Sequence, residues 1–122
     1  MADTSKAQII RRCFAAYKSK DRKALEDLLA DDFTFTSPYD DRINKATYFE
    51  RCWPESLRIR VSVLERIFEQ GDEAFVTYKC LTADEKEFSN TEFHVFEGDR
   101  IKQIDVYFGA TYQDGKFVKS AS

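Results

Sequence analysis

The sequence predicts an α+β domain with helices in its first half and an antiparallel sheet in its second half. In the first 53 residues, apolar side chains mostly recur at the three- and four-residue spacing of amphipathic helices. From residue 57 onward the apolar period becomes two, and short polar or glycine-containing turns separate four alternating runs. Helices and strands that are segregated along a chain pack as helices on one face of a sheet, which is the α+β arrangement.

Two helices are predicted at the start of the chain. The first spans residues 4–18, with Asp3 or Thr4 as its expected N-terminal cap. Asp21 is expected to cap a second, shorter helix, and the short link between them makes the two helices neighbours. The apolar faces of the two helices are Ile10, Cys13, Phe14 and Tyr17, and Ala24, Leu25, Leu28 and Leu29.

A short strand and a third helix follow. Residues 33–36 alternate and predict a strand that stops at Ser37 and Pro38, and the polar residues 40–44 predict a loop. Asn44 is a good cap for a helix over residues 45–53. Pro54 is expected to end that helix, because proline removes a backbone donor and crowds the preceding turn.

The rest of the chain predicts an antiparallel meander. Its four strands are residues 58–63, 74–81, 87–96 and 101–108, separated by turns at Gly71, at residues 82–86 and at Gly98. Residues 113–122 are polar and are expected to fray. The 122 residues are enough for one core but too few for two, so we expect a single domain, 1–122, whose ordered core is about 4–112.

Composition excludes several classes of function. Hydrophobic residues make up 43% of the chain and aromatic residues 15%, so a packed fold is expected rather than disorder. The net charge is −3 and no basic block occurs, which argues against nucleic acid as a partner. Arg58, Arg60 and Arg66 alternate with apolar residues and predict the outward face of a strand. No apolar run approaches the length of a membrane span.

The sequence also predicts neither a metal nor a cofactor. It has one histidine, no metal-ligand spacing and four glycines that are spread singly, so no zinc site or phosphate loop is expected. The three cysteines are odd in number, and the polar N-terminus lacks a secretory signal. We therefore expect free, mostly buried thiols and a cytoplasmic protein.

The last predicted hairpin gathers polar side chains on one face. A two-residue turn at residues 98–99 places Glu97 opposite Arg100, and this register continues along both strands. A slip of one residue would exchange the two faces. Burying this many polar side chains in a dry core would cost free energy. They therefore predict a polar pocket or a solvated face. The pairs on that face are His94 with Gln103, Glu92 with Asp105, and Asn90 with Tyr107.

His94, Asp105 and Glu92 are the candidate catalytic residues. An imidazole suits proton transfer near neutral pH, and two opposed carboxylates repel, so that one of them keeps its proton. Such a cluster suits general acid–base chemistry on a carbonyl compound. Tyr107, Gln103 and Asn90 would orient the substrate. The alternative is a solvated strand face or a satisfied polar network without chemistry.

Several aromatic residues suit the wall of a pocket. Simple core packing is the alternative, because aromatic residues on the inner face of a helix usually belong to the core. The residues concerned are Tyr17, Tyr39, Tyr48, Phe49 and Trp53.

The two ends of the sequence resemble the nuclear-transport-factor-2-like superfamily, and its SnoaL-like branch in particular. The opening segment is CFAAY at residues 13–17, KD at 20–21 and LLADDF at 28–33; the closing hairpin is FEGDRI at 96–101 and VYFG at 106–109. The resemblance covers roughly residues 8–112. It implies a cone, in which a strongly curved, mainly antiparallel sheet wraps three N-terminal helices around a hydrophobic pocket. It also implies a homodimer through the outer sheet face.

The resemblance does not extend to the usual site of ketosteroid isomerases. Their aspartate base, before a proline after the first strand, corresponds to Ser37, whose hydroxyl is too weak a base. Their first-helix tyrosine corresponds to Cys13, and their protonated aspartate roughly to Glu92. SnoaL-like cyclases place an acid near the position of Gly109, and Asp105 lies somewhat earlier.

Two functions remain open at this point. One is a cofactor-independent isomerase, cyclase or dehydratase that acts on a small hydrophobic carbonyl compound. The other is a non-catalytic ligand-binding module or dimeric scaffold. Fold alone does not decide between them.

Overall fold

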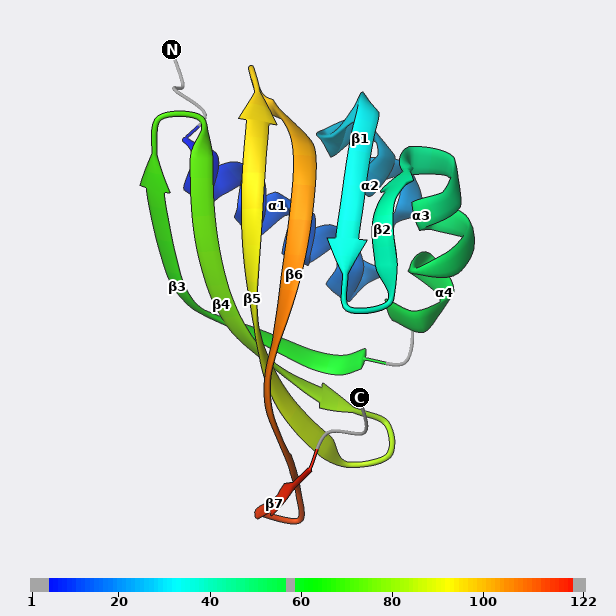
Figure 1. Ribbon diagram of the computed structural model, residues 1–122, viewed down its shortest axis with the longest axis vertical. Helices are drawn as coiled ribbons and strands as arrows, with labels where there is room; N and C mark the ends of the chain where they lie inside the picture. The colour runs from blue at the N-terminus through cyan, green and yellow to red at the C-terminus, as the bar shows by residue number, and fades with distance from the viewer. Residues whose placement is uncertain (1–4, 57–58, 120–122) are drawn as a thin grey trace.

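The computed structural model describes residues 5–56 and 59–119 and confirms an α+β fold (Figure 1). The helices are α1 (Lys6–Ser19), α2 (Arg22–Leu28), α3 (Lys45–Arg51) and α4 (Trp53–Ser56). The strands are β1 (Leu29–Ser37), β2 (Asp40–Asn44), β3 (Ile59–Gln70), β4 (Glu73–Thr82), β5 (Lys86–Glu97), β6 (Arg100–Gln113) and β7 (Lys116–Val118).

The strands form one mixed sheet in the order β2-β1-β6-β5-β4-β3, and β7 pairs with the end of β6. The pair β1–β6 is parallel and the other pairs are antiparallel, so the predicted meander of four strands is confirmed. The sheet curls into a half-barrel, and α1 crosses its concave face (Figure 1). This matches the predicted curved sheet wrapped around N-terminal helices.

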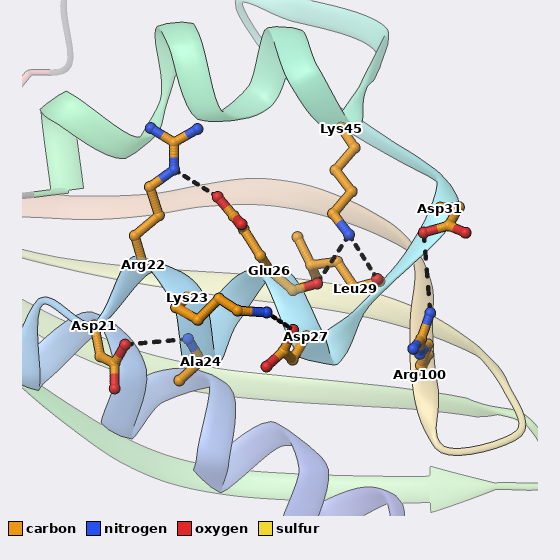
Figure 2. A network of polar contacts seen from close by, with 10 residues as sticks. All are labelled: Asp21, Arg22, Lys23, Ala24, Glu26, Asp27, Leu29, Asp31, Lys45 and Arg100. Carbon is orange, nitrogen blue, oxygen red and sulfur yellow. Dashed lines mark hydrogen bonds and ion pairs between the residues drawn. The ribbon is translucent and has the colours of Figure 1, made fainter.

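Side-chain caps start three of the helices. Asp21 accepts a hydrogen bond from the backbone N–H of Ala24, and Asn44 accepts one from Thr47, as predicted. Ser5 caps α1, whereas Asp3 and Thr4 lie outside the described residues. Lys45 reaches back from α3 and donates to the carbonyls of Glu26 and Leu29, as Figure 2 shows. These bonds satisfy carbonyl groups that the end of α2 would otherwise leave open.

The core lies between α1 and the concave face of the sheet. Alternate residues of each strand point inward, because strand side chains alternate between the two faces. Val76 and Ile101 are fully buried in this way. From the helices, Ile10 and Cys13 of α1 meet them, as the apolar spacing of that helix predicted.

Three local predictions were wrong. Residues 40–44 form the edge strand β2 instead of a loop, since an edge strand needs no apolar period. Pro54 does not end a helix but lies in the first turn of α4, where its missing N–H costs nothing. Lys116–Val118 form β7 after a turn at Asp114 and Gly115, instead of fraying.

A β-bulge changes the register of the last hairpin. Glu97 pairs with Arg100 and Phe96 with Ile101, as predicted, but Val95 then pairs with Gln103. Lys102 is therefore an extra residue on β6, and the pairing beyond it is shifted by one position. His94 consequently lies opposite Ile104, Glu92 opposite Val106 and Asn90 opposite Phe108.

Candidate functional site

A cavity of about 910 Å³ lies between the helices and the concave face of the sheet. Its wall includes apolar side chains from α1, β1 and β6, among them Phe14, Phe35 and Val106. Polar and charged side chains complete the wall, among them Tyr78 of β4, Glu92 of β5 and Arg51 of α3, so the lining of the cavity is partly apolar and partly polar. Such a mixture is typical of sites for small molecules.

The polar part of the wall is a chain of hydrogen bonds across β4 and β5. Tyr78 donates its hydroxyl to Glu92 Oε2 at 2.7 Å, and His94 Nε2 lies 2.9 Å from Glu92 Oε1. Asn90 donates from Nδ2 to the Tyr78 hydroxyl oxygen at 3.2 Å. Asn90, Tyr78 and Glu92 line the cavity, and the Glu92 side chain is 14% exposed. A mostly buried carboxylate thus faces the cavity with both oxygens held.

His94 supports Glu92 from behind the cavity wall. Its side chain is fully buried and stacks against Phe96, with 6.0 Å between ring centroids. Nδ1 has no hydrogen-bond partner among the described residues. A proton on Nδ1 would therefore be an unsatisfied buried donor, so the arrangement fits the neutral tautomer with its proton on Nε2. In this geometry His94 positions Glu92 and does not reach a ligand itself.

Tyr48 contributes an unused donor to the same cavity. Its ring is fixed by edge or tilted contacts with Phe33, Phe35 and Phe49, at centroid distances of 5.2, 4.9 and 5.4 Å. Within the described part of the chain, the hydroxyl has no hydrogen-bond partner, although Tyr48 is only 3% exposed and lines the cavity. Buried tyrosine hydroxyls usually have a partner, so this donor is available to a ligand.

Burial and Glu92 together set the ionisation of the neighbouring groups. Burial, first, and the charges of Cys13 and Glu92, next, raise the pKa of Tyr48 well above its ordinary value. Burial and Glu92 likewise raise the pKa of Tyr78 and of the Cys13 thiol. Both tyrosines therefore keep their protons and act as hydrogen-bond donors at neutral pH.

The structure separates the predicted catalytic cluster. Because of the bulge at Lys102, Asp105, Gln103 and Tyr107 lie on the convex face, so the predicted pairing of Glu92 with Asp105 is wrong. Asp105 accepts a hydrogen bond from Gln103 at 3.0 Å, and Tyr107 is 55% exposed. None of these three residues lines the cavity. Of the predicted catalytic residues, Glu92 and His94 remain together.

The predicted aromatic wall is divided in the same way. Tyr17, Tyr39 and Tyr48 line the cavity, whereas Phe49 and Trp53 are buried in the core beside it. Trp53 packs against Tyr17, with 5.7 Å between ring centroids. Arg60, expected on an outward strand face, lines the cavity instead.

Sequence reasoning missed two parts of the cavity wall. Tyr78 alternates with Val76 and Cys80, and this pattern already placed its hydroxyl on the inner face, where it needs a partner. The second part joins Ser37 and Asp40 to Arg51. Ser37 donates to Asp40 Oδ2 at 2.9 Å, and Arg51 Nη2 lies 2.9 Å from Asp40 Oδ1. No sequence signal pointed to it, because residues 40–44 were expected to be a loop.

Aromatic side chains also gather on the convex face of the sheet. Phe75 and Phe93 lie on neighbouring strands with 5.0 Å between ring centroids. Phe75 is 49% exposed, and Tyr107 and Phe68 are exposed nearby on β6 and β3. Exposed apolar residues that adjoin one another are typical of contact surfaces.

Two features are absent from residues 5–56 and 59–119. These residues contain no group of three or more histidine, cysteine or acidic side chains placed to hold a metal ion. They also contain no helix that is long and apolar enough to cross a membrane.

Comparisons with known proteins agree with this architecture. An NTF2-like protein of unknown function from Cytophaga hutchinsonii superposes with a TM-score of 0.73 at 17% identity, covering 88% of this chain and 93% of its own. A candidate ketosteroid isomerase from Kribbella flavida superposes with a TM-score of 0.73 at 17% identity. The match covers 86% of this chain and 78% of the isomerase chain. A candidate polyketide cyclase from Sinorhizobium meliloti superposes with a TM-score of 0.68 at 19% identity. The match covers 81% of this chain and 93% of the cyclase chain.

The structural likenesses at these identities show the fold alone. No curated protein matches the sequence. The profile of the SnoaL-like domain matches residues 10–104, which is most of the chain. This confirms the resemblance seen in the sequence: the chain belongs to the SnoaL-like domain family, within the NTF2-like superfamily.

Proposed function

We propose that the cavity binds a small, largely apolar carbonyl compound and that Glu92 removes a proton from the carbon next to the carbonyl. The observation that carries this proposal is the hydrogen-bonded chain from Asn90 through Tyr78 to Glu92 and His94, placed on the wall of a cavity that apolar side chains also line. A carboxylate fixed in this way is a suitable general base. Isomerisation, cyclisation and dehydration can all begin with such a proton transfer.

The neighbours of Glu92 have separate roles in this scheme. Tyr78 and His94 each hold one carboxylate oxygen, which fixes its orientation toward the cavity. His94 is thus a positioning residue, and Asn90 orients the Tyr78 hydroxyl. Precise placement of a base relative to the carbon it attacks accounts for much of the rate of such reactions.

Tyr48 supplies the complementary group. When a proton leaves the carbon, negative charge develops on the carbonyl oxygen, and a fixed donor in a water-poor site stabilises that charge strongly. Tyr48 lines the cavity, and its hydroxyl has no hydrogen-bond partner among the described residues. Its raised pKa keeps the proton in place for donation. The base and the donor therefore come from β5 and α3.

The test measures proton abstraction directly, without knowledge of the final product. The protein is incubated in D₂O with a panel of apolar ketones and keto acids, and loss of the α-proton signal is followed by ¹H NMR. We expect exchange of at least one compound by the wild-type protein and none above background by Glu92→Gln. Asp105→Asn is the matched control, since it makes the same change on the convex face.

A non-catalytic role remains the second candidate, favoured by the aromatic convex face. In that case the protein is a homodimer that joins through Phe75, Phe93 and Tyr107, and its cavity only stores or presents a ligand. Sedimentation tests the dimer: Phe75→Asp is expected to convert a two-chain species into a single chain. Ligand binding without any α-proton exchange would favour this role over catalysis.

We also propose that the protein works in the cytoplasm. The three thiols, Cys13, Cys52 and Cys80, are all free, as is usual in a reducing compartment. Fractionation of the native cells followed by detection of the protein tests this location.

A further inference from the structure

The lining of the cavity has an excess of positive charge. The chain as a whole carries a net charge of −3, yet cationic side chains outnumber acidic ones among the described residues that line the cavity. The cations are Lys18, Lys20, Arg51, Arg60, Lys86 and Lys119, and the acids are Asp40, Glu55, Asp84 and Glu92.

The cations of the lining also differ from its acids in exposure. The side chains of Glu92 and Asp40 are 14% and 9% exposed, whereas the Arg51 side chain is 53% exposed. Lys18 and Lys119 are exposed as well. Two of the four lining acids are therefore mostly buried, whereas all six cations are exposed, so cations outnumber acids among the exposed, described residues of the lining.

Arg51 is held at the mouth by a built arrangement. Its partner Asp40 has a side chain that is only 9% exposed, with an Nη2–Oδ1 distance of 2.9 Å. The other Asp40 oxygen accepts from the Ser37 hydroxyl, which in turn accepts the backbone N–H of Tyr39 at 3.1 Å. A guanidinium has five N–H donors, and this ion pair engages one nitrogen. Among residues 5–56 and 59–119 the guanidinium has no other polar partner, so its remaining donors can hold a second acidic group.

The lysines at the mouth strengthen the same field. Arg60 and Lys86 have acidic neighbours, Glu85 at 3.4 Å and Asp84 at 4.0 Å. Lys18, Lys20 and Lys119 have no ion pair with any residue in 5–56 or 59–119, although all three line the cavity. Their charges are not compensated locally, so they attract an anion.

We propose that the ligand of this cavity is an amphipathic acid, with one carboxylate at the mouth beside Arg51 and Lys18 and an apolar body that reaches inward. This inference rests on the proposed function of the cavity. The apolar body lies along Phe14, Phe35 and Val106. Repulsion from Glu92 keeps the acid group at the mouth, so the carbonyl end is the end that meets Tyr48 and Glu92.

A pair of fluorescent probes that differ in charge tests the proposal. The anionic probe is 1-anilinonaphthalene-8-sulfonate, and N-phenyl-1-naphthylamine is its uncharged analogue. Because a charge-assisted hydrogen bond adds to the apolar contacts, we expect the anionic probe to bind about tenfold more tightly at low salt. Its advantage should shrink at high salt, because exposed charges are screened. Energy transfer from Trp53, the only tryptophan, reports that a probe is bound to the protein.

Arg51→Gln is expected to weaken the anionic probe about tenfold and to leave the uncharged probe within about twofold. Arg12→Gln is the matched control, since it removes the same charge from an exposed position on α1 that does not line the cavity. Arg51→Gln also leaves Asp40 without its partner, so a second variant is needed. Lys18→Gln combined with Lys119→Gln changes only exposed side chains and should weaken the anionic probe about threefold.

The outcomes separate this proposal from the proposed function. Equal binding of both probes, with no effect of the charge variants, would overturn the acidic ligand and leave the apolar cavity site standing. Failure of both probes to bind would overturn the cavity site and, with it, the acidic ligand. Selective loss of the anionic probe in both charge variants, but not in Arg12→Gln, supports the proposal.

Discussion

The two faces of the β5–β6 hairpin carry similar polar residues in very different surroundings. On the concave face, Glu92 is held by Tyr78 and His94 on the wall of the cavity. On the convex face, Asp105 is held by Gln103 and lies beside exposed Tyr107. Each face has a carboxylate with a neutral donor, but only the concave one is enclosed. Enclosure, and not residue type, decides which carboxylate is placed to act on a ligand.

The extra residue Lys102 creates this difference. Without the bulge, Asp105 and Glu92 would share a face and form a pair of opposed carboxylates. With the bulge, β6 presents Ile104 and Val106 inward, so no carboxylate of β6 shares a face with Glu92. A single carboxylate with neutral donors is suited to act as a base.

The largest expected effect concerns the two carboxylates themselves. Glu92→Gln should lower α-proton exchange at least about 100-fold, the usual contribution of a general base. Asp105→Asn should leave the exchange rate within about twofold, because Asp105 does not reach the cavity. The NMR exchange assay measures both. A larger loss for Asp105→Asn than for Glu92→Gln would reverse the assignment of the faces.

The next effect compares matched valines on the two faces of the sheet. Val76 is fully buried on the concave side, whereas Val63 is 54% exposed. Val76→Ala should lower the free energy of unfolding by about 2–3 kcal/mol, from the lost methyl groups and the cavity they leave. Val63→Ala should change it by less than about 0.5 kcal/mol. Urea unfolding measures both values, and equal costs would contradict the observed burial.

A third comparison uses matched tyrosine hydroxyls. Tyr78→Phe removes a donor from Glu92 and an acceptor from Asn90, so it should cost about 1.5–3 kcal/mol of stability and slow α-proton exchange. Tyr107→Phe removes an exposed hydroxyl and should cost less than about 0.5 kcal/mol. Urea unfolding and the exchange assay test the pair. No difference between the variants would mean that the Tyr78 hydrogen bonds contribute nothing.

The last effect is a dependence of stability on alkaline pH, to which Cys80 contributes together with Cys13, Tyr48 and Tyr78, whose pKa values are also raised. Burial, the largest cause, raises the pKa of the Cys80 thiol from 9.0 to about 11. The unfolded chain therefore loses this proton before the folded protein does, and stability should fall as the pH rises from 9 toward 11. The urea midpoint, measured at pH 8, 9, 10 and 11, checks the sign. Cys80→Ala should make the urea midpoint depend less steeply on pH. A midpoint that rises between pH 9 and 11 would contradict the predicted loss of stability.

Local sequence patterns predicted the helices well, because capping residues and apolar spacing each involve residues that are close together in the chain. Asp21 and Asn44 cap the helices that they were expected to cap. The edge strand β2 could not be predicted, because polar residues satisfy an edge strand as well as a loop. Its pairing with β1 depends on residues outside the segment, so the sequence of residues 40–44 alone does not predict it.

About half of the candidate site could be predicted from the sequence. Glu92, His94 and Asn90 share one strand, so their common face follows from simple alternation. Asp105, Gln103 and Tyr107 depended on register across the hairpin, and one inserted residue moved all three. The signal was present in the spacing of β6: Ile101 and Ile104 are both buried although they are three positions apart. An alternating strand cannot place residues three apart on one face unless it contains a bulge.

Interstrand nuclear Overhauser effects between β5 and β6 test the central claim, that Glu92 faces the cavity and Asp105 faces away from it. If Glu92 faces the cavity, backbone contacts of Glu92 with Val106 and of His94 with Ile104 are expected. Contacts of Glu92 with Asp105 and of His94 with Gln103 would contradict this claim, since they would return both carboxylates to one face.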